Sequence, residues 1–120
     1  MAYRASCQIA NLEFMQFHPT LFFQEKSPPF LITEAIRGEG GKLVNADGQS
    51  FMHKYHASAN LGPRDVVTRA IRTEMQVNNA NCVYLDIRQK AKEKIIKSFP
   101  TIYAHCLKYQ IDITQQLIPV

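Results

Sequence analysis

The sequence predicts an α+β fold, and three observations support that class. The chain has 120 residues, which is enough for one modest hydrophobic core. Apolar residues make up 46% and charged residues 20% of the chain, as in ordinary globular proteins. Strand-like and helix-like stretches follow one another without the repeated strand–helix–strand unit of a parallel sheet. We therefore expect one domain over residues 1–120, with short antiparallel strands and several helices.

The first third of the chain predicts a strand, an irregular connection and a short helix. Residues 12–17 (LEFMQF) favour a strand, which Pro19 ends because its nitrogen cannot donate a hydrogen bond. Prolines and a serine interrupt residues 22–30, as in an irregular loop. Thr33 is placed to cap a helix over residues 34–37, and a glycine cluster follows as its stop signal: Gly38, Gly40 and Gly41.

The middle third predicts a hairpin followed by an amphipathic helix. The turn residues Asn45–Gly48 lie between two short apolar stretches, which indicates a hairpin over residues 42–51. From Asp65 onward, apolar residues recur every three or four positions, which predicts a helix with Pro63 near its first turn. These apolar residues are Val66, Val67, Ala70, Ile71 and Met75.

The last third predicts one strand, two helices and an irregular tail. The run CVYLD at residues 82–86 is typical of a compact strand. Helices are expected over residues 89–98 and 100–109, with Pro100 at the start of the second. The remaining residues show no regular period and are expected to be irregular.

Charge and hydropathy exclude several classes of protein. The net charge is +4, but the basic stretch at residues 88–97 is interrupted by Glu93 and contains no aromatic residue to stack on a base. It is best interpreted as a solvated helix face. No apolar run is long enough to span a membrane, and residues 1–10 do not resemble a signal peptide.

The cysteines and histidines predict neither a disulfide framework nor a metal site. Cys7, Cys82 and Cys106 are an odd number at wide spacings, which favours reduced thiols in the cytoplasm. Each lies among apolar residues, so we expect buried, inert thiols. The four histidines do not combine with them at the spacing of a metal site. The glycines at 38–41 follow a helix instead of opening one, so they are not expected to bind phosphate.

Gln16 and His18 form the first candidate site. If residues 12–17 are a strand, alternation places these two polar side chains on the same face. A protonated histidine with an amide donor beside it can hold a carboxylate. On pattern alone, the better interpretation is a histidine in the core and a glutamine on the surface.

Glu34, Arg37 and Arg64 form the second candidate site. Arg64 lies in the first turn of a helix, where the positive end of the helix dipole disfavours a cation. Glu34 and Arg37 are three residues apart, so they can pair on one helix face and leave Glu34 free to reach another arginine. The alternative interpretation is a set of solvated ion pairs.

Several strings of the sequence closely resemble a known family. The strings LEFMQFHPT, FLITEAIRGEGGKLVNADGQSFM and GPRDVVTRAI resemble the capping domain of the succinate dehydrogenase/fumarate reductase flavoprotein superfamily. Within that superfamily, the strings CVYLDI, FPTIY, YQIDIT and IPV are similar to those of the L-aspartate oxidases. The resemblance extends in order over essentially the whole chain.

The resemblance implies a small capping (substrate-lid) domain from the interior of a larger FAD-dependent enzyme, whose FAD is held mainly by another domain of the same protein. The implied reaction transfers a hydride from L-aspartate to FAD and gives iminoaspartate, with oxygen or fumarate as the final acceptor. It would serve quinolinate formation in NAD biosynthesis, with quinolinate synthase as an implied partner. The alternatives are a flavoprotein subunit of succinate dehydrogenase or fumarate reductase and, more remotely, a stand-alone basic binding module.

The resemblance also implies roles for individual residues. His18, with Gln16 beside it, would lie at the substrate and the isoalloxazine ring, and Leu31 and Thr33 would contact a substrate carboxylate. Arg64 matches the arginine that the family uses as proton donor and acceptor, and Glu34 with Arg37 match the relay that supplies it. Because a free arginine has a pKa above about 12, a base role needs burial and the helix N-terminus to lower that pKa. Binding a substrate carboxylate is the milder role for Arg64.

The chain also departs from the family pattern. Relatives usually have acidic residues within the segment 55–62 and glycine where this chain has Gln110, and we expect neither difference to touch the site. No GxGxxG fingerprint occurs, and the second histidine and the additional substrate arginine of the family would lie beyond Val120. We therefore expect the isolated segment to bind FAD poorly and to be inactive.

Overall fold

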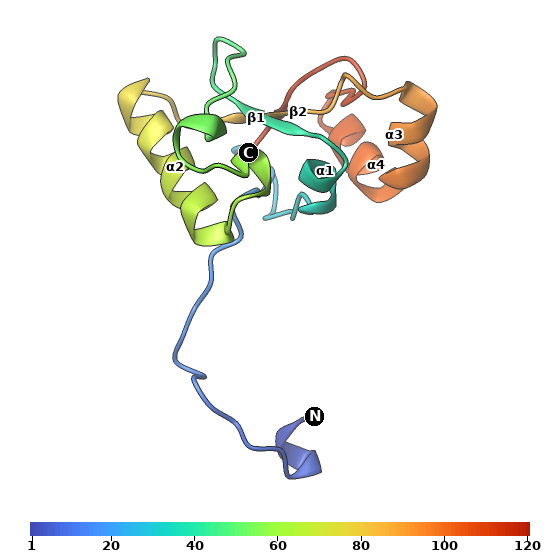
Figure 1. Ribbon diagram of the computed structural model, residues 1–120. Coiled ribbons are helices and arrows are strands. Elements are labelled where there is room, and N and C mark those ends of the chain that lie inside the picture. Colours follow the sequence, from blue (N-terminus) through green and yellow to red (C-terminus); the bar gives the residue numbers. More distant parts are fainter.

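The computed structural model describes residues 1–120 and contains one three-stranded antiparallel sheet with four α-helices around it (Figure 1). The spatial order of the strands is β1-β2-β3. Figure 1 shows α2 at one end of the sheet and α3 and α4 at the other, with α1 between them. The strands are β1 (Lys42–Val44), β2 (Tyr84–Asp86) and β3 (Ile118–Pro119), and the helices are α1 (Ala35–Gly38), α2 (Arg64–Val77), α3 (Lys92–Ser98) and α4 (Pro100–Lys108).

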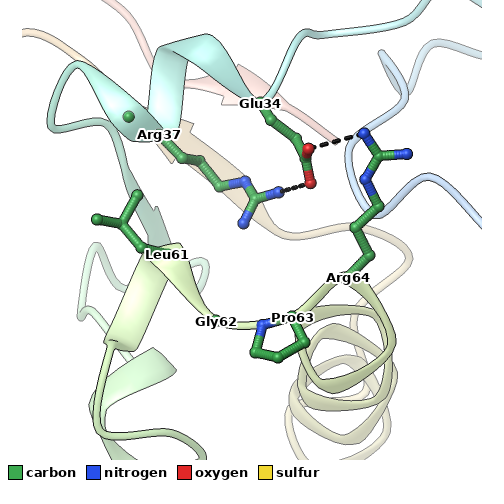
Figure 2. Close-up of a pocket in the computed structure, with 7 residues that line it drawn as sticks. Glu34, Arg37, Leu61, Gly62, Pro63 and Arg64 are labelled. Atoms are coloured by element: carbon green, nitrogen blue, oxygen red, sulfur yellow. Dashed lines mark hydrogen bonds and ion pairs between the residues drawn. The ribbon is translucent and has the colours of Figure 1, made fainter.

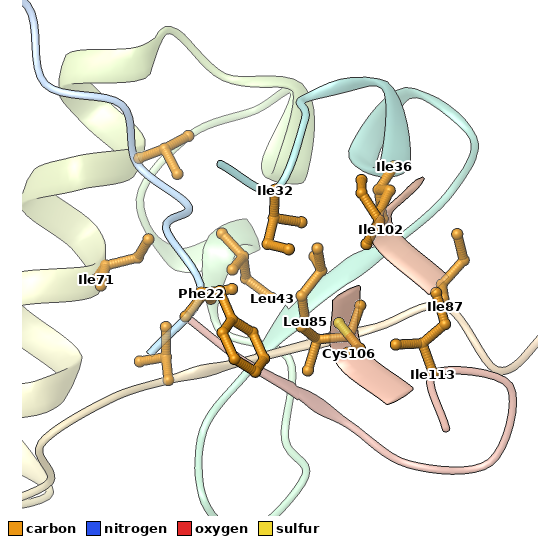
Figure 3. Packing of buried hydrophobic residues seen from close by; sticks show 14 of the residues in the cluster. Phe22, Ile32, Ile36, Leu43, Ile71, Leu85, Ile87, Ile102, Cys106 and Ile113 are labelled. Atoms are coloured by element: carbon orange, nitrogen blue, oxygen red, sulfur yellow. The ribbon is translucent and has the colours of Figure 1, made fainter. Parts of the chain in front are cut away.

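The register of the sheet places three core residues side by side, one from each strand. Leu43 of β1 pairs with Leu85 of β2, which in turn pairs with Ile118 of β3. All three side chains are fully buried, and Figure 3 shows Leu43 and Leu85 among the core residues contributed by the helices. The sheet is small, and these three paired residues form part of the core on which the helices pack.

The third strand corrects the prediction of an irregular tail. β3 has two residues, too few for a periodic pattern, and one of them is Pro119. Proline is tolerated there because β3 is an edge strand, where one row of backbone N–H groups has no ladder partner. The pairing continues at Val120, which exchanges backbone hydrogen bonds of 3.1 and 2.9 Å with Val83.

The predicted hairpin is present only in its first half. β1 is a strand, but the chain returns through a single bridge between Val44 and Ser50. The Asn45 side-chain oxygen holds the turn by accepting the backbone N–H groups of residues 47 and 49. Phe51 and Met52 are both buried, which one face of a strand cannot provide for consecutive residues, and the chain forms a 3₁₀ turn over Met52–Lys54.

The predicted helix after Pro63 is confirmed as α2, whose Val67, Ala70 and Ile71 side chains are buried against the core. The two later helices are also confirmed, and Pro100 occupies the first turn of α4 as expected. α3 begins at Lys92 instead of residue 89, because residues 87–90 form a turn closed by the Lys90 N–H and the Ile87 carbonyl. None of the helices combines the length and the apolar character needed to cross a membrane.

The strand predicted over residues 12–17 is absent. These residues belong to an extended arm that runs away from the folded part of the chain (Figure 1). Phe14, Met15 and Phe17 are at least 73% exposed, and no strand of this chain pairs with the arm. Strand propensity reflects how well side chains pack on a sheet, so without a partner strand it produces no strand.

The three cysteines are free and differ in burial, which corrects the expectation that all are buried. Cys106 on α4 is buried, and its burial raises the pKa of the thiol to about 12. Cys82 is partly buried, whereas Cys7 lies exposed on the arm. Apolar neighbours in the sequence therefore bury a cysteine only where the surrounding segment joins the core.

Only glycine fits at position 41, because the backbone there lies close to Ile36 of α1. A Cβ added at Gly41 would lie 2.8 Å from both the backbone oxygen and a side-chain carbon of Ile36, whereas one added at Gly38 would meet nothing within 4 Å. We expect Gly41→Ala to lower the free energy of unfolding by about 1–3 kcal/mol, because this crowding forces the backbone to move. Thermal unfolding would measure the effect.

The matched control is Gly38→Ala, which fills open space inside the same helix. It should leave the stability unchanged or raise it slightly, since alanine loses less backbone entropy than glycine on folding. Equal melting temperatures for the two variants would contradict the steric role of Gly41.

Candidate functional site

The backbone between residues 18 and 34 is folded back on itself, which sets the starting geometry of the site. The Thr20 hydroxyl donates to the Ile32 carbonyl at 2.8 Å, and the Ile32 N–H donates to the Thr20 carbonyl at 3.1 Å. α1 follows directly and is anchored by the fully buried Ile36. Thr33 accepts the Ala35 N–H at 3.3 Å, which agrees with its predicted capping role, although Glu34 occupies the N-cap position itself.

The carboxylate of Glu34 bridges two arginines, as its spacing from Arg37 predicts. Glu34 Oε1 accepts a hydrogen bond from Arg37 Nη2 at 2.8 Å, and Oε2 accepts one from Arg64 Nη2 at 2.8 Å (Figure 2). The hydrogen bond from Arg64 is the main reason why the pKa of Glu34 lies below its usual value. We call Arg37, Glu34 and Arg64 together the ion-pair chain.

Arg37 is the buried end of the ion-pair chain. Its side chain is only 3% exposed, and burial lowers the pKa of its guanidinium against the opposing effect of Glu34. Besides Glu34, the guanidinium has one further acceptor, the Asn60 carbonyl, at 2.6 Å from Nη1. The Nε atom is buried without a hydrogen-bond partner, so the orientation of the group depends on these two acceptors.

Arg64 is the exposed end of the ion-pair chain and the first residue of α2. Its side chain is 41% exposed, and the hydrogen bond to Glu34 raises the pKa of its guanidinium. The expectation that burial and the helix N-terminus lower this pKa is therefore wrong for this chain, because a carboxylate 2.8 Å away outweighs both effects.

The ion-pair chain lines a cavity of about 310 Å³ between α1 and the loop that leads into α2 (Figure 2). One wall consists of charged side chains and the other of the loop residues before Arg64. The full lining is Glu34, Arg37, Gly38, Leu61, Gly62, Pro63 and Arg64.

Gln16 and His18 reach the same region from the arm. The Arg64 Nη1 atom donates to Gln16 Oε1 at 3.2 Å, which leaves the Gln16 amide nitrogen available as a donor. His18 Nδ1 lies 3.1 Å from the Thr20 carbonyl, and burial lowers the pKa of the imidazole. This lowered pKa favours the neutral imidazole over the positively charged form that the sequence pattern suggested.

Leu31 and Thr33 lie apart from this cavity. Both line a separate hollow of about 360 Å³ beside Phe99 and Pro100, at the junction of α3 and α4. Leu31 is 50% exposed and forms an isolated bridge with Leu21. The structure thus brings Gln16, Glu34, Arg37 and Arg64 together by direct contacts, but it does not bring Leu31 or Thr33 to them.

Asn60 is a residue of the site that no sequence pattern indicated, and it contacts Arg37. It lies in the segment 55–62, which was expected not to touch the site, yet its carbonyl accepts the Arg37 hydrogen bond. Its side-chain oxygen also accepts the backbone N–H of Leu43 at 2.8 Å. No sequence pattern predicts a contact made by a backbone carbonyl 23 residues away from its partner.

The residues present offer no cradle for the phosphates of a dinucleotide. Such a cradle follows a strand and opens a helix, whereas the glycines at 38–41 close α1 and precede β1. The chain also has no group of three or more histidine, cysteine, aspartate or glutamate side chains that could hold a metal ion. The donors that it does offer, the Arg64 guanidinium and the Gln16 amide, suit a carboxylate.

Comparisons with known proteins match the chain along its whole length. The family described as "FAD binding domain" matches residues 1–120. L-aspartate oxidase 1 of Ralstonia nicotianae is 53% identical and L-aspartate oxidase of Pseudomonas aeruginosa 52% identical, each over all 120 residues and 22% of its own length. The chloroplastic L-aspartate oxidase of Arabidopsis thaliana is 47% identical over 129 residues, covering all of this chain and 20% of its own length.

Solved structures of fumarate reductases have the same fold. A mutant of the E. coli quinol fumarate reductase matches 92% of this chain and 22% of its own chain, with a TM-score of 0.78 and 31% identity. A quinol–fumarate reductase with menaquinol molecules matches 76% of this chain and 19% of its own, with a TM-score of 0.70 and 32% identity. The chain spans about a fifth of the length of the relatives it matches.

Proposed function

The chain belongs to the FAD binding domain family, and from this premise we propose that it is the capping, substrate-facing segment of an L-aspartate oxidase. About half of its residues are identical to those of L-aspartate oxidases over its full length, which supports the substrate. The observation that carries the chemistry is the Arg64 guanidinium, held by Glu34 and placed against the Gln16 amide. A cation with a neighbouring amide donor suits a carboxylate substrate.

In the proposed reaction, L-aspartate is oxidised to iminoaspartate: Cα loses a hydride and the amino group loses a proton. FAD, when bound, supplies the acceptor for the hydride, and oxygen or fumarate reoxidises it. Because this chain offers no phosphate cradle, we assign the binding of FAD to another part of the protein and derive no cofactor-binding step here.

Within this proposal, Arg64 binds a substrate carboxylate as a cation and also passes a proton to or from the substrate. Its raised pKa favours the binding role, since the guanidinium stays protonated while Glu34 is beside it. Arg64 can give up a proton only when its ion pair with Glu34 is broken or when Glu34 is itself protonated. Arg37 stabilises the Glu34 carboxylate from the buried side. Gln16 and the neutral His18 would orient the substrate, and Leu31 and Thr33 would contact it only after the capping segment closes over it.

The second candidate function is that of the flavoprotein subunit of succinate dehydrogenase or fumarate reductase. The structural likeness to two fumarate reductases favours it, because the ion-pair chain would serve a C4 dicarboxylate without an amino group equally well. The higher identity to L-aspartate oxidases places this function second.

The test compares substrates in the whole protein that carries this segment. We expect peroxide to form when L-aspartate is added under air, with little or no oxidation of succinate. D-aspartate serves as a matched control, since it carries the same charges with the opposite configuration at Cα. Oxidation of succinate alone would contradict the proposal and support the second candidate.

Three further features of the whole protein are part of this proposal. The small sheet with helices at both ends supports a capping domain, in which the exposed face of Arg64 would look towards the FAD-containing part. The three free cysteines support a reducing compartment such as the cytoplasm. Quinolinate synthase is proposed as a partner on the family resemblance alone.

A further inference from the structure

Asn60 makes two hydrogen bonds that join the sheet to the ion-pair chain. Its backbone carbonyl accepts the Arg37 Nη1 hydrogen bond at 2.6 Å, and its side-chain Oδ1 accepts the Leu43 N–H at 2.8 Å. The residue lies in the middle of the 3₁₀ turn Ala59–Leu61, between β1 and α1 in space. One residue therefore fixes the position of a catalytic-site arginine relative to the hydrophobic core.

The bond to Leu43 gives Asn60 a rigid support. β1 is an edge strand, and Leu43 is its fully buried central residue. A buried backbone N–H without an acceptor is costly, so the Asn60 side chain is held firmly at this edge. The carbonyl of the same residue is thereby fixed against the guanidinium of Arg37.

The loop after Asn60 connects it directly to Arg64, so the position of Asn60 also affects the exposed end of the ion-pair chain. Only Leu61, Gly62 and Pro63 separate Asn60 from Arg64, and these three residues line the same cavity. Gly62 is tightly placed, because a Cβ there would lie 3.3 Å from the Ala59 carbonyl. A shift of Asn60 would therefore move the start of α2 as well as Arg37.

We propose that Asn60 is a positioning residue, which sets the geometry of Arg37, Glu34 and Arg64 by fixing one backbone carbonyl to the edge of the sheet. The inference rests on the proposed function, because it assigns the ion-pair chain a part in turnover. Asn60 itself touches neither substrate nor cofactor and acts only through Arg37 and the loop to Arg64.

The test uses Asn60→Ala and Asn60→Asp in the whole protein. Alanine removes the acceptor for Leu43, and misplacing a reacting geometry by about 1 Å costs up to about 100-fold, so we expect kcat to fall about 10-fold to 100-fold with a smaller change in KM. Aspartate keeps an acceptor of the same shape and should restore most of kcat. In the alanine variant, the acid limb of the pH profile of kcat should move to higher pH, because Glu34 loses well-placed arginines.

Asn45→Ala is the matched control. Asn45 is a buried asparagine that follows β1, and like Asn60 it accepts backbone N–H groups through its Oδ1, but it makes no hydrogen bond to the ion-pair chain. It should reduce stability while leaving kcat and the pH profile unchanged. A similar loss of kcat in both alanine variants, or no rescue by aspartate, would overturn the inference.

Two measurements keep the inference separate from the proposed function. Hydrogen–deuterium exchange of the peptide that contains β1 should be faster in Asn60→Ala than in the wild type, and this readout needs no substrate. If the alanine variant is insoluble, Asn60→Gln misplaces the same amide and should show the same exchange and kcat effects. Wild-type protein that oxidises no dicarboxylate would contradict the proposed function, whereas normal exchange in β1 would contradict the role of Asn60.

Discussion

Arg64→Lys in the whole protein should lower kcat on L-aspartate by about 100-fold or more, the scale of a lost general acid–base group. Arg64 uses two guanidinium nitrogens at once, one towards Glu34 and one towards Gln16. A lysine ammonium is a single point charge on a flexible stem and cannot reproduce this fork. Steady-state kinetics at saturating aspartate would separate the effect on kcat from that on KM.

The two roles considered for Arg64 predict different results in this variant. If Arg64 moves a proton, kcat falls even at saturating substrate, whereas a purely binding role raises KM and leaves kcat near the wild-type value. Arg69→Lys is the matched control, since Arg69 lies five residues later on α2 and pairs with the exposed Asp65. Near-native kcat in Arg64→Lys would contradict the proton-transfer role and leave Arg64 as a carboxylate-binding residue.

Glu34→Gln should impair both turnover and stability. The amide keeps the shape of the side chain but removes the charge that holds Arg64 and the buried Arg37. We expect kcat to fall by about 100-fold. The free energy of unfolding should drop by about 1–2 kcal/mol, near the low end for a lost charged hydrogen bond because Glu34 is itself partly exposed. Kinetics and urea unfolding would measure the two effects.

The stability effect of Glu34→Gln should depend on pH in a defined direction. The pKa of Glu34 is lowered in the folded protein from its ordinary value of 4.5. Its contribution to stability is therefore fully present above that value and is lost as the pH falls through the lower, folded pKa. The wild-type and variant unfolding curves should differ by a constant amount at neutral pH and converge in acid.

Glu39→Gln is the control for Glu34→Gln, because Glu39 is a nearby, more exposed carboxylate paired with Lys94 at 3.2 Å. Solvated ion pairs of this kind contribute little to stability. An equally small effect of both substitutions would support the alternative interpretation, in which the Glu34 pairs are ordinary surface ion pairs.

Local patterns predicted those parts of the molecule whose structure depends on neighbours in the sequence. The apolar period from Asp65 onward predicted α2, and the three-residue spacing of Glu34 and Arg37 predicted the contact between the Glu34 carboxylate and Arg37. In both cases the interacting groups lie on one helix face, so helical geometry alone brings them together.

Patterns failed where the structure depends on distant partners. Residues 12–17 have strand propensity but no partner strand, and β3 has a partner strand but only two residues. The pKa of Arg64 rises because a carboxylate on another helix lies 2.8 Å away, a distance that the helix position of Arg64 does not reveal. The contact from Asn60 uses a backbone carbonyl, which every residue type possesses.

The order of the strands also constrains how the molecule folds. β2 is the central strand, and it pairs on one side with β1, about 40 residues earlier, and on the other with β3, more than 30 residues later. Neither pairing is a local hairpin, so both loops must close before the sheet gains its stability, which slows folding. During synthesis, Leu85 would remain on an open sheet edge until residues 118–120 have left the ribosome. The interval before their release is therefore the stage at which this segment is most exposed to mispairing and aggregation.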